Sequence, residues 1–159
     1  MTLHMKAPAD EIWSLVSDVT KIGLYSPETF EAEWLDGATG PAVGARFRGH
    51  VKRNGRGPVY WTQCRVKACE PGKEFTFAVE AGGKAVNTWS YKLVPAGDGT
   101  DVTESFELSP TPPMRIYWAL LGWARGKTNE EGMRRTLERI KDQVEAAGAG
   151  RGEPSAPGA

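Results

Sequence analysis

The sequence has few of the features that mark metal-binding, secreted or membrane-spanning proteins. Its 159 residues include only two cysteines and two histidines, and none of them stands at the spacing of metal ligands, so we expect no metal ion. No apolar run approaches the roughly 18 residues of a membrane-spanning helix. The N-terminus lacks the basic and apolar segments of a secretory signal. We therefore expect a cytoplasmic protein with no stable membrane insertion.

The sequence also lacks an excess of charge of either sign. Its 20 basic and 20 acidic residues cancel, which argues against a nucleic-acid partner. Charged residues make up 25% of the chain, as in ordinary globular proteins, so disorder of the whole chain is excluded. The length fits a single domain, expected over residues 1–147. Residues 148–159 are mostly Gly, Ala, Pro and Ser and are expected to form a disordered tail.

The two cysteines, Cys64 and Cys69, lie five residues apart on one expected strand. Odd spacing places them on opposite faces of that strand, so we expect two free thiols rather than a disulfide. There is no phosphate-binding loop, dinucleotide fingerprint or Ser/His/Asp arrangement, and we expect no cofactor.

Tryptophan, by contrast, is abundant, with six in the chain. Each supplies a large apolar surface and one N–H group that needs a partner. Such a set suits either a thick core or the wall of a ligand cavity.

Helical signals stand at the start of the chain. Residues 2–6 form a short candidate strand, and Ala7–Glu11 has the proline and acidic residues of a helix start. Apolar residues at helical spacing follow from Ile12 to Val19, and a second short helix or turn is expected near residues 20–25.

From residue 28 the apolar period changes to two. Strands are expected at residues 30–34, 46–51, 60–70, 74–81, 87–94 and 101–108, joined by short turns that are mostly rich in glycine. Consecutive hairpins predict an antiparallel sheet. In the first hairpin, Glu31 and Glu33 are expected to share the solvent face with Arg46 and Arg48.

A long helical pattern follows the proline-rich break at residues 109–113. Its apolar stripe ends in Leu137, Ile140 and Val144 and should face the sheet. Gly122, Gly126 and Gly132 predict a kink in its first half. The apolar segment 114–123 is either a core helix or a mobile lid or homodimer surface. The fold class is therefore α+β: an antiparallel sheet of six to seven strands against one long C-terminal helix, with two short helices after the first strand.

Four segments carry a family resemblance: residues 7–18, 43–49, 69–75 and 99–105. With this element order, roughly residues 3–147 resemble the START-like (SRPBCC) superfamily of polyketide cyclases/dehydrases and lipid-transfer proteins. The first strand, which begins at Met1, is shorter than is usual there. The resemblance implies a helix-grip fold, a twisted sheet wrapped around the C-terminal helix, with a cavity for a hydrophobic small molecule between them.

The alternation of side chains along the expected strands independently directs several aromatic residues toward that cavity. The candidate ligand-binding residues are Trp34, Phe47, Cys64, Phe75, Phe77, Trp89, Tyr91, Glu104, Phe106, Ile116 and Leu120. Glu104 shares its face with Val102 and Phe106, so it needs a partner, which can be Tyr91, Trp89 or a donor on the helix, or a raised pKa. It is a candidate acid/base or polar anchor, or else a structural carboxylate. His50, the other candidate base, points outward by phase.

Three functions remain open. The first is binding or carriage of a hydrophobic small molecule, such as a lipid or a polyketide. The second is a polyketide aromatase/cyclase that uses a cavity acid/base. The third is a stress- or toxin-associated regulatory protein that acts through its surface. An enzyme needs two converging ionisable groups, and the sequence offers one strong inward candidate, which favours binding.

Overall fold

The elements follow the predicted order. A computed structural model describes residues 1–52, 57–109 and 112–151; the side chains of residues 112–129 and 151 lie outside that description. The elements are β1 (Thr2–Met5), α1 (Ala9–Ser17), the 3-10 helix η1 (Val19–Leu24), β2 (Thr29–Trp34), β3 (Arg46–Lys52), β4 (Val59–Glu70), β5 (Glu74–Ala81), β6 (Lys84–Ala96), β7 (Gly99–Leu108) and α2 (Pro112–Arg151).

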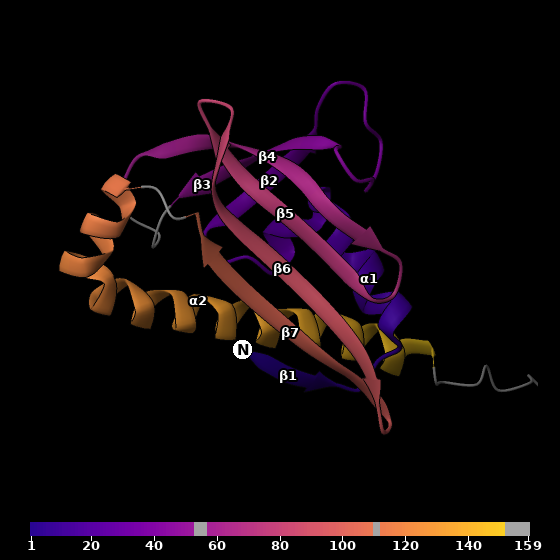
Figure 1. The fold of residues 1–159 in the computed structure, drawn as a ribbon. Coiled ribbons are helices and arrows are strands. Elements are labelled where there is room, and N and C mark those ends of the chain that lie inside the picture. The colour runs from indigo at the N-terminus through magenta and orange to yellow at the C-terminus, as the bar shows by residue number, and fades with distance from the viewer. Residues whose placement is uncertain (53–56, 110–111, 152–159) are drawn as a thin grey trace, which may run out of the picture.

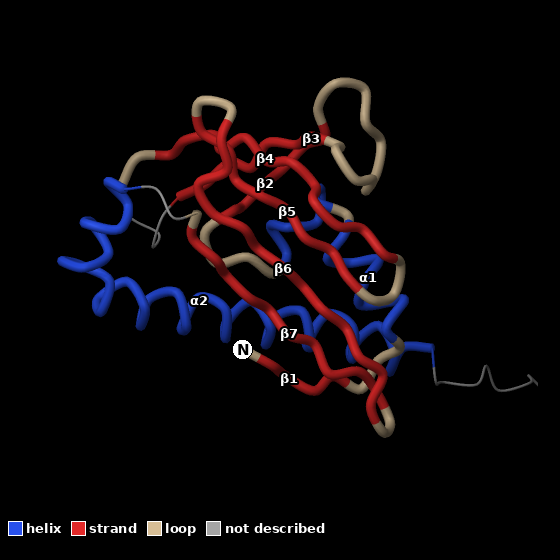
Figure 2. The backbone as a smooth tube through the Cα atoms, in the orientation of Figure 1, coloured by secondary structure: helices blue, strands red, loops and turns tan. Residues whose placement is uncertain are grey.

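These seven strands form one antiparallel sheet in the order β1-β7-β6-β5-β4-β3-β2. The sheet is twisted, and α2 runs along it, as Figures 1 and 2 show. This is the α+β helix-grip fold that the sequence predicted. The orange, N-terminal part of α2 turns away from the axis of the rest (Figure 1), in agreement with the predicted kink. α2 continues through Gly148, the expected start of the tail, to Arg151; residues 152–159 lie outside the described residues.

The core lies between the sheet and its helices. Leu137 and Ile140 of α2 and Ile12 of α1 are fully buried in the same cluster as the inward side chains of the sheet. The indole N–H of Trp13 donates to the carbonyl oxygen of Glu74, 3.1 Å away, and fixes α1 to β5. The helices thus close one end of the sheet's inner face with a solid apolar core.

Strand β1 is held at the sheet edge by a histidine between two carboxylates. Nδ1 of His4, on β1, lies 2.8 Å from Oδ1 of Asp101 on β7. Nε2 of the same ring lies 3.2 Å from Oδ1 of Asp98, in the turn before β7. The hydrogen bond with Asp101, followed by that with Asp98, raises the pKa of His4. These two contacts fasten β1 to β7, and they become ion pairs when the imidazole is protonated.

Two bulges change the faces that strict alternation predicted. The ladder between β2 and β3 shifts between Thr29 and Glu31, so Phe30 is exposed instead of sharing a face with Ala32 and Trp34. A bulge adds one residue to one strand and reverses the alternation beyond it.

The second bulge corrects the expectation for the cysteines. The ladder between β4 and β5 shifts between Val66 and Ala68 and pairs Cys69 with the buried Phe75. Cys64 and Cys69 consequently both face the core, as free thiols. Burial raises the pKa of Cys64 to about 12, so this thiol stays protonated and unreactive at neutral pH.

Candidate functional site

An aromatic wall covers the inner face of the sheet across several strands. Trp34 of β2 meets Phe47 of β3 edge-on at 5.6 Å between ring centroids, and Phe47 meets Phe77 of β5 at 5.2 Å. On the neighbouring strands, Trp89 of β6 and Phe106 of β7 are 4.7 Å apart. Strand register explains the alignment, because Phe77 pairs with Trp89 and Trp89 pairs with Phe106. Residues far apart in the sequence thus form one continuous apolar surface.

Burial varies along this wall. Phe75 is completely buried, and Phe47 is 1% exposed. Trp34, Trp89 and Phe106 on the same face are only half-buried. The wall is therefore packed solidly toward α1 and the C-terminal half of α2, and it retains accessible aromatic surface farther along the strands.

A carboxyl group lies within this apolar surface. Glu104 of β7 is 2% exposed and is the register partner of Tyr91 on β6. The Tyr91 hydroxyl donates to Oε1 of Glu104 at 2.9 Å. Oε2 is buried and has no hydrogen-bond partner within the described part of the chain. The inward orientation predicted from the sequence is present, and of the three partners considered there the structure shows Tyr91.

The environment of Glu104 favours its neutral form. Burial raises its pKa from 4.5 to about 8, against the smaller opposing effects of the Tyr91 hydrogen bond and the N-terminal ammonium group. At neutral pH the carboxyl group is therefore mostly protonated. Its free oxygen can carry a proton that is available to an acceptor within the apolar interior.

Sequence reasoning missed a third member of this cluster. Tyr25, at the end of η1, is 1% exposed, and its hydroxyl donates to the carbonyl oxygen of Val16 at 3.3 Å. Burial raises the pKa of both Tyr25 and Tyr91, and the nearby Glu104 charge raises both further. Tyr25 follows a 3-10 helix rather than a strand, so no alternation marked it as inward. Only the packing of η1 against the sheet brings it close to Glu104.

The other candidate residues fall into two groups. Cys64 is buried beside the aromatic wall as a register partner of Phe47. The side chains of Ile116 and Leu120, expected to complete the site from the helix, lie outside the described residues, as do the other side chains of the apolar segment 114–123. What these helix positions contribute to a ligand site therefore stays a prediction.

The outer face of the sheet carries the alternative base and the basic residues. His50 stacks on Trp61 with ring centroids 4.3 Å apart, and its Nδ1 lies 2.5 Å from Glu31. Arg48 lies over the Trp61 ring and pairs with Glu33. His50 thus points outward as predicted. Because Arg48 is paired with the carboxylate of Glu33, this outer face is a solvated surface of mixed charge.

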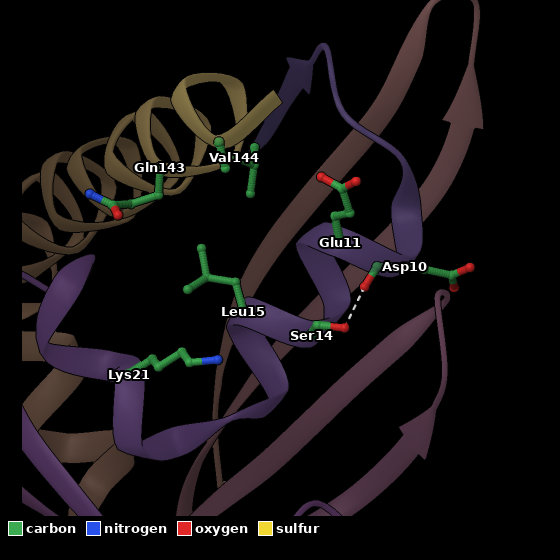
Figure 3. Close-up of a pocket in the computed structure, with 8 residues that line it drawn as sticks. Asp10, Glu11, Ser14, Leu15, Lys21, Gln143 and Val144 are labelled. Carbon is green, nitrogen blue, oxygen red and sulfur yellow. Dashed lines mark hydrogen bonds between the residues drawn. The ribbon is translucent and has the colours of Figure 1, made fainter. Parts of the chain in front are cut away.

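A separate groove runs between α1, η1 and the C-terminal part of α2 (Figure 3). Its volume is about 490 Å³, and its lining residues are Asp10, Glu11, Ser14, Leu15, Lys21, Gln143, Val144 and Ala147. None of the candidate ligand-binding residues lines it. Its lining mixes charged and apolar side chains, so it lacks the aromatic character of the inner face.

The described residues contain no group of three or more side chains suited to holding a metal ion. Among the described helices, none is long and apolar enough to cross a membrane.

Solved structures of similar proteins agree with this architecture. The chain is 32% identical to a polyketide-cyclase-like protein from Corynebacterium glutamicum, over 94% of this chain and 85% of that one, with a TM-score of 0.51. A Nitrosomonas europaea protein aligns at 16% identity over 94% of both chains, with a TM-score of 0.66. A Chromobacterium violaceum protein aligns at 19% identity over 91% of this chain and 96% of that one, with a TM-score of 0.60. The latter two likenesses concern the fold alone.

No curated protein matches the chain. The sequence profile of one family does match, over residues 1–145, which is nearly the whole described chain. Its extent and the fold agree with the superfamily resemblance seen in the sequence. The chain belongs to the family described as polyketide cyclase / dehydrase and lipid transport.

Proposed function

We propose that this protein binds an apolar small molecule with an oxygen function between the inner face of its sheet and α2. The observation that carries the proposal is the buried Oε2 of Glu104, which lies on an aromatic surface and has no hydrogen-bond partner among the described residues. A buried polar atom without a partner costs about 1–3 kcal/mol. A ligand carbonyl or hydroxyl oxygen that accepts the Glu104 proton removes this cost, while the aromatic wall binds the apolar body of the ligand.

Trp89 is expected to form part of the binding surface. It is half-buried on the inner face and in contact with Phe106. Trp61 offers a matched control, because it is a tryptophan on the outer face of the same sheet and is 40% exposed. Replacing each with alanine removes the same chemical group from opposite faces.

The test is a fluorescence titration of the purified chain with the neutral apolar dye Nile red, preceded by native mass spectrometry and organic extraction to detect a co-purifying molecule. We expect saturable binding of one dye molecule, weakened at least fivefold by Trp89→Ala and unchanged by Trp61→Ala. Equal effects of the two substitutions, or no dye binding by extracted wild-type protein, would refute an inner-face site.

A cyclase or dehydrase reaction is the second candidate, and the cluster of Glu104, Tyr91 and Tyr25 favours it. A carboxyl group whose pKa is about 8 can give and take a proton near neutral pH. In the dehydration of a β-hydroxy ketone, the Glu104 carboxyl would protonate the departing hydroxyl. The β C–O bond breaks and water leaves. The resulting carboxylate then takes the proton lost from the α-carbon as the C=C bond forms.

This activity has a direct assay. 4-Hydroxy-4-phenylbutan-2-one loses water to give benzylideneacetone, which absorbs in the near ultraviolet. Catalysis by the wild type that Glu104→Gln abolishes would support the enzyme. Dye binding without any acceleration of this dehydration would favour simple binding.

A further inference from the structure

A second polar atom on the inner face has no partner in the described part of the chain. Asn87 of β6 pairs with Val79 on one side and Leu108 on the other, in the same alternation as Trp89 and Tyr91. It therefore faces inward. Its Oδ1 is buried and, within the described residues, accepts no hydrogen bond. Unpaired buried oxygens are rare in native proteins and call for an explanation.

Asn87 and Glu104 lie at opposite ends of one strip, which is the inner face of β6 and β7 between these two residues. Glu104 pairs with Tyr91, and Asn87 lies four residues before Tyr91 on β6, which corresponds to about 13 Å along the strands. The register pair Trp89 and Phe106 lies between these two ends. The strip thus has a hydrogen-bonding group at each end and an aromatic floor between them.

The ends differ in chemistry. The protonated carboxyl of Glu104 offers a donor, and the amide oxygen of Asn87 offers an acceptor. Among the described residues that face inward on β2–β7, the only lysine or arginine is Lys84, which pairs with Ala81 at the exposed tip of the β5–β6 hairpin, at the far end of the strip from Glu104. Near Glu104 the described inward residues of these strands supply no lysine or arginine, and the N-terminal ammonium group already donates to the backbone carbonyl oxygen of Glu104. An anionic group of a ligand would therefore be buried there at high cost.

We infer that the site selects an elongated, flat and uncharged molecule with an oxygen function at each end. Its carbonyl oxygen accepts from Glu104, and its hydroxyl group donates to Asn87. The body that spans about 13 Å along the strip is a fused-ring or similarly rigid apolar scaffold that stacks on Trp89 and Phe106. This inference rests on the proposed function and adds the length, neutrality and polarity of the ligand.

The test uses a rigid androstane skeleton as a probe, in four forms: with a ketone at one end and a hydroxyl at the other, with the ketone alone, with the hydroxyl alone, and with neither. Binding is measured as displacement of Nile red from wild type, from Asn87→Leu and from Thr88→Val, whose altered residue lies on the outer face of the same strand. Asn87→Ala serves as a second variant, and the urea midpoint of each variant reports its folding.

In wild type and in Thr88→Val, removing the probe hydroxyl should weaken binding about fivefold to tenfold. In Asn87→Leu and Asn87→Ala, the same removal should have little effect, because the partner of the hydroxyl is gone. A further variant, Glu104→Leu, lacks the carboxyl donor; removing the ketone should weaken binding to wild type but not to this variant.

Equal affinity for all four probes, or equal hydroxyl effects in wild type and both Asn87 variants, would overturn the two-ended site and leave the proposed binding function intact. Binding of Nile red without displacement by any androstane would overturn the inferred scaffold and spacing. Failure of wild type to bind either the dye or a probe would overturn the proposed function itself.

Discussion

Replacing Glu104 with glutamine is expected to change how the stability of the protein depends on pH. The pKa of Glu104 is raised from 4.5 to about 8 by burial, so between these pH values the folded protein keeps a proton that the unfolded chain has released. The free energy of unfolding therefore falls as the pH rises through this window, and above it the buried charge has its full cost. Glutamine is neutral at every pH and removes this contribution.

The size of the effect follows from the pKa. Within the window, each pH unit lowers the free energy of unfolding by about 1.4 kcal/mol. The complete contribution is about 4–5 kcal/mol, a large share of the roughly 5–15 kcal/mol that stabilises a typical domain. The free energies of unfolding of wild type and Glu104→Gln should thus differ little near pH 5. Near pH 8.5 the value for the variant should be higher by about 4 kcal/mol.

Urea unfolding followed by tryptophan fluorescence at several pH values between 5 and 8.5 measures this difference. Glu107→Gln is the matched control, since Glu107 is an exposed carboxylate on the outer face of the same strand. Its pH profile should follow that of wild type. Parallel curves for wild type and Glu104→Gln would show that the carboxyl group does not remain protonated in the folded state, and would remove the donor on which the proposed site depends.

Three further predictions concern neighbouring parts of the structure. Tyr91→Phe removes the hydroxyl that donates to Glu104 and should lower the free energy of unfolding at pH 6 by about 1–3 kcal/mol; no loss in urea titrations would contradict a buried hydrogen bond. Gly23→Ala places a methyl group against the backbone carbonyl of Phe30 and should lower the melting temperature by several degrees, roughly 1–3 kcal/mol; calorimetry showing an unchanged melting temperature would exclude this close approach. His4 has a raised pKa, so its stabilising ion pairs are complete below about pH 6.5 and are lost as the pH rises through the raised value. His4→Gln should therefore lose stability mainly at low pH, and an equal loss at pH 5.5 and pH 9 would argue against protonation as the cause.

Much of the fold follows from local sequence. The period-two segments and their turns define consecutive hairpins, and the apolar stripe of α2 marks the face that carries Leu137 and Ile140, both fully buried. The same alternation places Phe47, Phe75 and Glu104 inward, and all three are buried. These features depend on side-chain direction within one element, which the sequence pattern determines directly.

Other features arise only when strands pair and elements pack. The bulge in β2 turns Phe30 outward, and the bulge in β4 brings Cys69 to the same face as Cys64. A bulge depends on how two strands align, and alternation in one strand does not reveal it.

The candidate site depends on both kinds of information. By itself, the sequence determined that a carboxyl group and an aromatic wall face inward. The tertiary structure decided that Tyr25 joins Glu104, and that Oε2 of Glu104 and Oδ1 of Asn87 have no partner among the described residues. The reason is physical: side-chain direction is a local property, whereas a missing hydrogen bond depends on every group that the fold brings within reach.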